Sequence, residues 1–518
     1  MTDASPPEAL PTLDAHVRWW AAHHGAREAA VLDAARWSYA TLDSEVASLA
    51  RAMLAAGVTK GERVATLAPP GLDFLAAYLA ATRIGAIWVG LNPRYRFDEL
   101  AHVLRDAEPR LLLARDHPDL AAIGSLSPKT VLLDHPGDFG AFIAGGDDLS
   151  AGALEAAIAR VTADDPAVLV YTSGSTGKPK GAILSHGGIV RFARGQNEVW
   201  PMSPLRVLNY FPINHVGCLN DILAPALVGG GTCVFMEQFD TRHSLQLMQD
   251  EGITFWASVP SVFQMQLALP DFASFDLSAV QLIVWEGAAM APEVIERLGT
   301  ICPLRATNYG MTETTSGITV LPPSSDAELL GASVGHPFPG VEVRLADGEG
   351  NLVPAGEAGE VQARSALNCL GYWRNAEATA AAFTADGWFR TGDLAEQRPD
   401  GAYRLVGRIK EMFKSGGYNV YPREVETVLE AHPDVTAAAV VGIADPVWDE
   451  VGVGFIEGAA TPEELAAWCR ERLANYKIPK HFHIEPALPL LPIGKIDKPA
   501  LRARAAAMHA AAHQQENA

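Results

Sequence analysis

The chain has 518 residues, of which 48% are hydrophobic and 19% charged, so it is long enough to form two or more globular domains. A total of 61 Asp and Glu residues against 40 Lys and Arg gives a formal net charge of −21, which repels nucleic acid and anionic membrane surfaces and excludes both as expected partners. An anionic ligand must therefore be met by locally concentrated cations.

The five cysteines are widely spaced and form no C-x-x-C pair, so we expect neither a disulfide framework nor a zinc site. The first residues, MTDASPPEALPTL, lack the basic start and apolar core of a signal peptide. The strongest candidate for a membrane span, residues 75–91, is short and is interrupted by Arg83. These features predict a cytoplasmic protein without a membrane span.

Short apolar runs alternate with helical stretches through most of the chain before residue 341. A helix is predicted at residues 73–84, where the apolar spacing suits a helical face. This alternation favours α/β layers with largely parallel sheets. The predicted strands are residues 63–67, 167–171, 206–211, 232–236, 254–259 and 281–285.

The stretch YTSGSTGKPKG at residues 171–181 directly follows one of these strands. Glycines let main-chain N–H groups approach phosphate oxygens, and lysines neutralise their charge, so the loop suits a polyphosphate. A flexible surface loop is the alternative, and the spacing is not that of a Walker A loop. The candidate phosphate-binding residues are Thr172, Ser173, Gly174, Ser175, Thr176, Gly177, Lys178 and Lys180.

The pattern changes twice in the last third of the chain. Short strands and turns, such as the strand predicted at 342–345, indicate a β-rich subdomain at about 335–409 within an N-terminal domain of residues 1–409. A helix at 422–430, a strand at 436–442 and a Thr-capped helix at 461–475 predict a small α+β domain over residues 410–518. Residues 503–518 are expected to form a frayed tail. The predicted fold is α/β: a large N-terminal domain of layered sheets with the β-rich subdomain, and a small mobile C-terminal domain.

Four further motifs follow the loop in order: YGMTE at 309–313, WFRTGD at 388–393, GRIK at 407–410 and GKIDK at 494–498. This ordered set resembles the adenylate-forming superfamily, which includes acyl- and aryl-CoA ligases, adenylation domains of peptide synthetases and beetle luciferases. The resemblance extends from about residue 37 to about residue 501. It implies ATP, Mg²⁺ and coenzyme A as cofactors, and a reaction in which an acid becomes acyl-AMP with release of pyrophosphate before its acyl group passes to a thiol.

The resemblance also implies roles for residues around the nucleotide. Glu313 corresponds to the glutamate that holds Mg²⁺ between phosphate oxygens, and Thr312 to a phosphate contact. Asp393 corresponds to the carboxylate on the ribose hydroxyls, with Arg408 beside the ribose and phosphates. By residue type alone, Thr312 and Glu313 suit a helix cap equally well, and Asp393 suits a turn. Further nucleotide-binding residues are Asn308, Tyr309 and Gly310, and, against the adenine, Gly287, Ala288 and Ala289.

Two lysines are assigned to the two reaction steps. Lys495 matches the lysine that bridges the substrate carboxylate and the phosphate during adenylation, with Lys498 as a possible helper. Lys410 matches the hinge about which the small domain turns before thioester formation. Ser415, Gly416 and Gly417 would then face the pantetheine arm of CoA, although Tyr418 replaces the glutamate of many relatives.

His215 matches a residue that lines the acyl pocket and gates the carboxylate, whereas a lone histidine at a strand end is otherwise more often structural. The candidate pocket segments are residues 211–217, 285–290 and 309–311. They are apolar or neutral apart from His215 and Glu286, and residues 212–215 offer no acidic partner for a substrate ammonium. No Arg or Lys lies in these segments to pair with a second carboxylate, so the expected substrate is a monocarboxylic acid, fatty or aromatic.

Four functions compete on this evidence. The favoured function is an acid–CoA ligase that acts on a small carboxylic acid with ATP and CoA. The alternative is a stand-alone adenylation enzyme that loads an acyl group onto a carrier protein. A luciferase-like oxygenase and a nucleotide-binding regulator without catalysis are further possibilities. The oligomeric state, monomer or homodimer, stays open.

Overall fold

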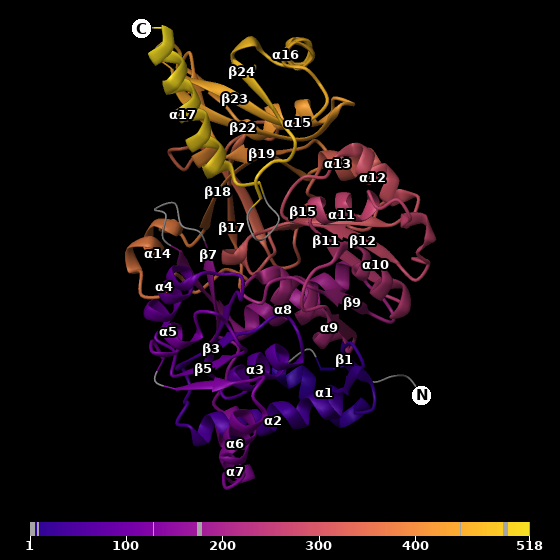
Figure 1. Cartoon of the computed structure of the whole chain (residues 1–518), viewed down its shortest axis with the longest axis vertical. Coiled ribbons are helices and arrows are strands. Elements are labelled where there is room, and N and C mark those ends of the chain that lie inside the picture. Colours follow the sequence, from indigo (N-terminus) through magenta and orange to yellow (C-terminus); the bar gives the residue numbers. More distant parts are fainter. Residues whose placement is uncertain are drawn as a thin grey trace.

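The computed structural model describes residues 6–7, 10–127, 129–172, 179–445, 447–490 and 496–516. Figure 1 shows the N-terminal elements at the bottom of the elongated molecule and the C-terminal elements at the top. The described helices are α1 (Leu13–His24), α2 (Tyr39–Ala55), α3 (Leu72–Arg83), α4 (Phe97–Ala107), α5 (Leu120–Gly124), α6 (Pro136–Ala144), α7 (Ala151–Ile158), α8 (His186–Val199), α9 (Ala224–Gly229), α10 (Thr241–Asp250), α11 (Pro260–Leu267), α12 (Pro292–Gly299), α13 (Ala327–Ala332), α14 (Ala376–Ala382), α15 (Pro422–Glu430), α16 (Pro462–Arg470) and α17 (Lys498–Glu516).

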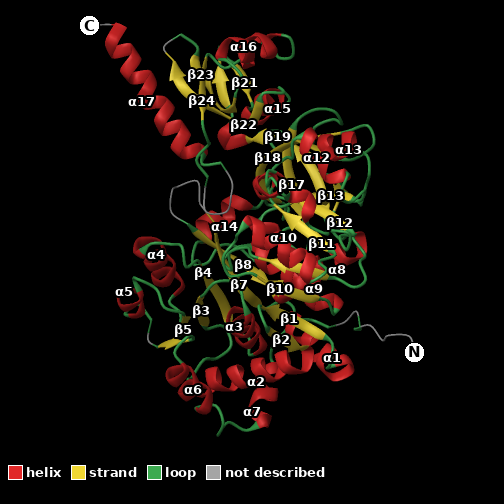
Figure 2. Ribbon diagram, turned by 45° about the vertical axis from the view of Figure 1, so that its right-hand side comes forward, coloured by secondary structure: helices red, strands yellow, loops and turns green. Residues whose placement is uncertain are grey.

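Two large sheets form the body of the molecule (Figure 2). The six-stranded sheet has the order β6-β5-β3-β4-β7-β8 and is parallel except for β8. Its strands are β3 (Arg63–Leu67), β4 (Ile87–Leu91), β5 (Leu111–Ala114), β6 (Thr130–Leu132), β7 (Pro166–Thr172) and β8 (Lys180–Ser185). The strands predicted at residues 63–67 and 167–171 are thereby confirmed.

The nine-stranded sheet has the order β15-β14-β13-β12-β11-β9-β10-β1-β2, and its six central strands run parallel. Its strands are β1 (Glu28–Leu32), β2 (Ala35–Ser38), β9 (Arg206–Asn209), β10 (Thr232–Phe235), β11 (Phe255–Ser258), β12 (Leu282–Trp285), β13 (Arg305–Tyr309), β14 (Thr319–Val320) and β15 (His336–Pro337). The predicted strands over this region are confirmed, each shorter than expected by one or two residues.

Helix α3 explains the long apolar run that could have suggested a membrane span. Phe74 of this helix contacts Trp88 of β4 and Phe235 of β10, with ring centroids 5.5 and 6.3 Å apart, so α3 lies between the two large sheets. Arg83 at its end is buried, and its guanidinium forms ion pairs with Asp14 at 2.7 Å and Asp43 at 2.5 Å. No helix within the described part of the chain is long and apolar enough to cross a membrane.

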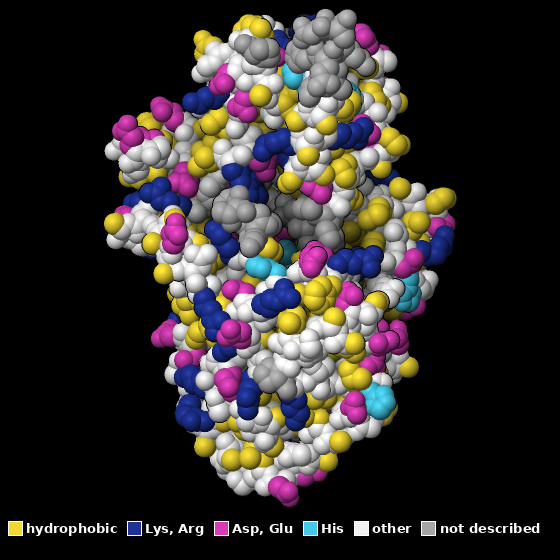
Figure 3. All heavy atoms as spheres, turned by 60° about the vertical axis from the view of Figure 1, so that its left-hand side comes forward, with side chains coloured by type: hydrophobic (Ala, Val, Ile, Leu, Met, Phe, Trp, Pro, Cys, Tyr) yellow, Lys and Arg dark blue, Asp and Glu magenta, His cyan; other side chains and the backbone are white. Residues whose placement is uncertain are grey.

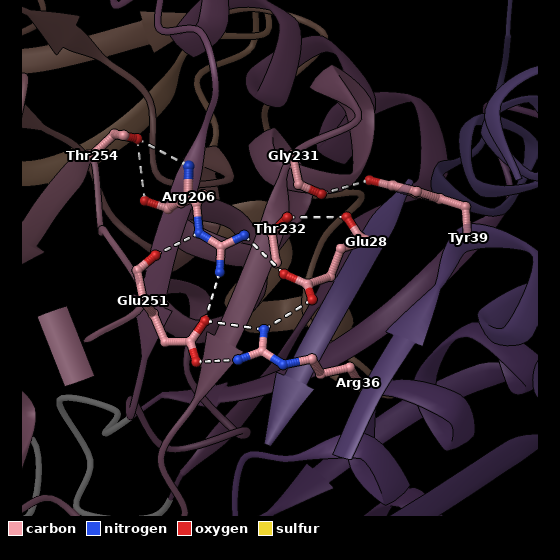
Figure 4. Close-up of polar contacts among 8 residues, drawn as sticks. All are labelled: Glu28, Arg36, Tyr39, Arg206, Gly231, Thr232, Glu251 and Thr254. Atoms are coloured by element: carbon pink, nitrogen blue, oxygen red, sulfur yellow. Dashed lines mark hydrogen bonds and ion pairs between the residues drawn. The ribbon is translucent and has the colours of Figure 1, made fainter. Parts of the chain in front are cut away.

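An ion-pair network ties together the strands of the nine-stranded sheet at their amino-terminal ends (Figure 4). Arg206 at the start of β9 pairs with Glu28 at 2.8 Å and with Glu251 at 2.7 Å. Arg36 of β2 pairs with the same two carboxylates at 2.9 and 2.5 Å. Thr232 at the start of β10 donates to the Glu28 carbonyl at 3.0 Å. Each of the two carboxylates pairs with two guanidiniums, so the network fixes the register of these strands at their amino-terminal ends. The carboxyl-terminal ends of the strands, at the opposite edge, remain available for a ligand.

The β-rich region is a four-stranded antiparallel sheet in the order β16-β17-β18-β19. Its strands are β16 (Glu342–Ala346), β17 (Gly359–Arg364), β18 (Phe389–Gln397) and β19 (Tyr403–Arg408). The C-terminal sheet has the order β21-β20-β23-β22, with β24 beside β23. Its strands are β20 (Phe413–Ser415), β21 (Tyr418–Val420), β22 (Val435–Asp445), β23 (Asp449–Gly458) and β24 (His481–Glu485). The fold class predicted from the sequence is confirmed, whereas the domain boundaries at 335 and 410 stay predictions.

Two C-terminal expectations were wrong. The helix that Thr461 caps ends at Arg470 rather than at 475, and a 3₁₀ turn, Asn475–Lys477, follows it. Residues 498–516 form α17 instead of a frayed tail. Leu501 and Ala505 of this helix belong to one apolar cluster with Val441 of β22 and Phe455 of β23. Their burial stabilises the helix, which the Ala-rich sequence alone did not predict.

Candidate active site

The predicted pocket segments follow the carboxyl ends of parallel strands in the nine-stranded sheet. Strand β9 ends at Asn209, β12 at Trp285 and β13 at Tyr309. Because β9, β11, β12 and β13 are neighbours and run parallel, these ends meet along one edge. Open α/β sheets bind their ligands at this edge. Figure 3 shows a recess on one face of the molecule, between the C-terminal elements above and the body below.

Glu313 connects the two large sheets. It lies in the 3₁₀ turn Thr312–Thr314, and its Oε1 accepts hydrogen bonds from Thr172 Oγ1 at 3.2 Å and Tyr372 Oη at 2.9 Å. Thr172 pairs with Lys180 across β7 and β8, and Lys180 Nζ lies 5.5 Å from the Tyr372 ring centroid. One end of the predicted phosphate loop thus contacts Glu313, and the other end lies beside Tyr372, which donates to Glu313. The loop residues Ser173, Gly174, Ser175, Thr176, Gly177 and Lys178 lie outside the described residues.

Asp393 is the centre of a second polar cluster. Its Oδ2 accepts a hydrogen bond from Tyr309 Oη at 2.9 Å, and its Oδ1 pairs with Arg408 Nε at 3.1 Å across β18 and β19. Burial raises the pKa of Asp393, although Arg408 and the Tyr309 hydroxyl oppose this shift. Burial alone would lower the pKa of Arg408. The negative charges of Asp393 and Glu411 outweigh this effect, so the pKa is raised overall, and Glu313 contributes to the same rise. The Arg408 side chain is 45% exposed whereas that of Asp393 is 8% exposed, so the guanidinium faces solvent and the carboxylate is buried behind it.

The residues around Glu313 fit Mg²⁺. No group of three or more His, Cys, Asp or Glu side chains within the described ranges could form a closed metal site. Mg²⁺ differs from zinc in that one or two carboxylates, completed by substrate phosphates and water, commonly bind it. Glu313, a single carboxylate flanked by the hydroxyls of Thr172 and Tyr372, suits that arrangement.

The small residues predicted to contact the nucleotide lie at the same sheet edge. Gly287, Ala288 and Ala289 are exposed directly after β12, and Gly287 has a φ of 81° that favours glycine. Asn308 and Tyr309 are buried at the end of β13. A Cβ on Gly310 would lie 1.8 Å from the carbonyl oxygen of Ser316, so only glycine allows this close approach of two backbones.

The predicted hinge residue, Lys410, lies between the β-rich sheet and the C-terminal sheet. Lys410 is exposed in the 3₁₀ turn Ile409–Glu411, which joins β19 to β20. Lys495 lies outside the described residues, and the chain on either side of it is joined by an antiparallel bridge between Leu490 and Ile496. Lys498 Nζ pairs with Glu411 at 2.9 Å and Glu426 at 2.7 Å. Lys498 therefore anchors the start of α17 beside the hinge.

Ser415, Gly416 and Gly417 form the hairpin between β20 and β21, separate from the Glu313 and Asp393 clusters. Gly416 and Gly417 have φ values of 58° and 85°, as a two-residue hairpin turn requires. The Gly416 N–H donates to the Trp448 carbonyl at 2.8 Å, and a Cβ there would lie 3.1 Å from the Trp448 ring. Among the described residues, no hydrogen bond or ion pair joins this hairpin to either cluster, so its predicted role toward CoA stays a prediction.

His215 lies where the chain leaves β9 and enters the π-helix η1 (Gly217–Leu223). The side chain is half-buried, and its Nδ1 accepts a hydrogen bond from the Gly217 N–H at 3.1 Å. In the neutral ring, Nε2 therefore carries the proton. π-Helical turns are rare and are frequent at functional sites, which is consistent with a role for this segment.

Sequence reasoning missed two features of the site. Tyr372, which donates to Glu313, lies in an ordinary Gly-Tyr-Trp stretch that carries no signal of this contact. Asp221 is buried on η1, outside the segments considered for the pocket, and its carboxyl faces Glu286 and Ser316. The sequence did carry one signal of this residue, because Asp221 is an acidic residue within the largely apolar stretch of residues 216–228. The expectation of a pocket with Glu286 as its lone acidic side chain was therefore incomplete.

The buried Asp221 should make stability depend on pH. Burial raises its pKa to about 7, and the nearby polar groups of Glu286 and Ser316 lower it only in part. The folded chain thus keeps a proton that the unfolded chain releases near pH 4, and this contribution to stability is lost as pH rises toward 7. We expect Asp221→Asn to stabilise the protein at pH 8 by on the order of 2 kcal/mol, with little effect at pH 4. Thermal unfolding at both pH values measures this, and a shift independent of pH would contradict it.

Comparisons with known proteins agree with this geometry. Residues 17–373 match the family model described as AMP-binding enzyme, and residues 424–495 match the AMP-binding enzyme C-terminal domain. The chain is 37% identical over 473 residues to a feruloyl-CoA synthase of Amycolatopsis sp., covering 90% of this chain and 94% of the relative. It is 31% identical to a long-chain fatty acid–CoA ligase of Mycobacterium tuberculosis, covering 90% and 93%. The crystal structure of ATP-bound MatB from Rhodopseudomonas palustris superposes with a TM-score of 0.82 at 27% identity, over 95% of this chain and 99% of that one.

Proposed function

The chain belongs to the AMP-binding enzyme family, and on this premise we propose that it is an ATP-dependent ligase that joins a monocarboxylic acid, fatty or aromatic, to coenzyme A. The observation that carries the proposal is that the two ends of the phosphate loop meet Glu313 and Tyr372, near the Asp393 and Arg408 pair. The relatives named feruloyl-CoA synthase and fatty acid–CoA ligase support an acid of either kind.

The first step joins two anions. A carboxylate oxygen attacks the α-phosphorus of ATP, the bond from that phosphorus to the bridging oxygen breaks, and pyrophosphate leaves with its electron pair. Lys180 and the loop donors bind the phosphates, while Asp393 accepts hydrogen bonds from the ribose hydroxyls and Arg408 offsets the charge nearby. Mg²⁺ bound through Glu313 would supply further neutralisation of the phosphate oxygens. Lys495 bridges the carboxylate and the phosphate as charge moves between them.

In the second step, the thiol of CoA replaces AMP on the acyl group. The CoA thiol attacks the acyl carbon, its proton passes to water, and AMP leaves with the electrons of the broken acyl–oxygen bond. His215 bounds the approach of the acid, and the hairpin of Ser415, Gly416 and Gly417 faces the pantetheine arm once the C-terminal domain has turned about Lys410. Removal of Lys495 from the cleft frees the space that the thiol needs.

A screen of pyrophosphate release tests the proposal. The purified protein with Mg²⁺ and ATP is given a panel of fatty and aromatic acids, with and without CoA, and acyl-CoA is measured by mass spectrometry. We expect acid-dependent pyrophosphate release and acyl-CoA product. Pyrophosphate release without any CoA thioester would favour the alternative, transfer to a carrier protein, and no release with any acid would reject adenylation.

Freezing the hinge should separate the two steps. Proline at position 410 fixes its own φ and disfavours the helical conformation of Ile409 before it, so Lys410→Pro restrains the turn that joins the two sheets. We expect the rate of thioester formation to fall by about tenfold or more, with a smaller effect on pyrophosphate release. The matched control Lys410→Ala keeps a flexible backbone and should retain both rates. An unaffected overall rate in Lys410→Pro would remove the domain rotation from the mechanism.

A further inference from the structure

We propose that Asp221, Glu286 and Ser316 form a polar recognition site for the far end of the acid, and that it selects acids carrying a hydroxyl or amino group there. The inference rests on the proposed function, because it concerns the acid that this site would adenylate. It narrows the expected substrate from fatty or aromatic acids in general to those with a hydrogen-bond donor remote from the carboxylate.

The three residues come from three separate parts of the chain. Asp221 lies on the π-helix η1, Glu286 directly follows β12, and Ser316 lies just after the turn that holds Glu313. Glu286 and Ser316 are both within hydrogen-bonding reach of the Asp221 carboxyl. Thr315 and Ser316 have φ values of 50° and 72°, a strained pair that turns the chain back after Glu313. The cluster therefore lies at the same sheet edge as the nucleotide residues.

Buried polar atoms without partners concentrate here, independently of the acidic pair. Ser316 is 5% exposed, and its Oγ, although close to Asp221, forms no hydrogen bond of normal geometry within the described part of the chain. Asp221 Oδ1 likewise accepts no hydrogen bond from a described residue. Both amide atoms of the adjacent, fully buried Asn220 also lack partners among the described residues. Such groups are costly to bury unless a ligand or water satisfies them.

Charge determines which end of the acid meets this cluster. A carboxylate would be repelled by Asp221 and Glu286, so the reacting end lies away from them, toward the cations of the phosphate site. Burial raises the pKa of Asp221 to about 7, and once ionised its carboxylate only accepts hydrogen bonds. A group that donates, such as a phenol, an alcohol or an amine, would therefore satisfy Asp221 Oδ1, whereas a purely apolar end would leave this oxygen without a partner.

Matched pairs of acids test the inference. We would measure kcat/KM for acyl-CoA formation with 4-hydroxycinnamate and 4-aminocinnamate against cinnamate, and with an ω-hydroxy fatty acid against the unsubstituted fatty acid of equal length. For the wild-type protein we expect at least one donor-bearing acid to exceed its partner by about tenfold or more. Comparison of the hydroxyl-bearing acid with the amino-bearing acid shows which donor group the recognition site prefers.

Substitutions in the cluster test whether Asp221 and Glu286 cause the preference for donor-bearing acids. Asp221→Leu and Glu286→Leu should lose the preference for the donor-bearing acid, so that the ratio of kcat/KM between the two members of each pair falls toward one. The control Glu293→Gln removes an exposed carboxylate at the start of α12 and should leave the preference unchanged. Equal kcat/KM for both members of every pair in the wild-type protein would overturn the inference while the ligase activity stands, and this comparison needs no variant to fold. No pyrophosphate release with any acid would overturn the proposed function and this inference together.

Discussion

Replacing Lys495 with alanine is expected to lower the rate of acid-dependent pyrophosphate release by about a thousandfold or more. Both reactants of the first step are anions, and a lysine that contacts the carboxylate and the phosphate together removes their repulsion where charge develops. The bridge between Leu490 and Ile496 and the anchoring of Lys498 by Glu411 and Glu426 hold the ends of the segment that carries this lysine. We therefore expect its cation to be delivered from the predicted C-terminal domain.

The second half-reaction should survive the same substitution. A supplied acyl-adenylate already contains the activated bond, so Lys495→Ala should convert it to the CoA thioester at close to the wild-type rate. The control Arg502→Ala removes an exposed cation from α17 and should leave both rates unchanged. Equal loss of the two half-reactions in Lys495→Ala would contradict the division of labour between the steps.

The substitution Glu313→Gln should also reduce adenylation, by about a hundredfold or more, through the loss of a metal-binding charge. Glutamine keeps the shape of the side chain and can still accept the hydrogen bonds of Thr172 and Tyr372, so the change isolates the charge. The rate should recover in part at high Mg²⁺, because the substrate phosphates still bind the ion. Titration of pyrophosphate release against Mg²⁺ concentration measures this effect.

Tyr372→Phe serves as the matched comparison for Glu313→Gln. It removes the 2.9 Å hydrogen bond that orients the carboxylate but keeps the charge, so we expect a loss of only several-fold with a modest rise in the Mg²⁺ requirement. An Mg²⁺ dependence of Glu313→Gln identical to that of the wild-type protein would show that Glu313 does not bind the metal.

Local patterns in the sequence were sufficient for the individual elements and for the family. The strand at residues 63–67, the helix that begins at Pro422 and the cap at Thr461 all depend on neighbours a few positions away, and they are present as expected. Periodicity, caps and turns are properties of short segments, which is why sequence alone determined them.

The tertiary structure decided what the distant residues do together. Thr172, Glu313 and Tyr372 come from widely separated positions, and only the packing of the two large sheets makes them neighbours. The same is true of Asp221 and Glu286, whose meeting changed the expected character of the acid site. Helix α17 formed because β22 and β23 offered an apolar surface to Leu501. Contacts of this kind depend on the order of strands in the sheets and on burial, and neither is encoded in the spacing of residues within one segment.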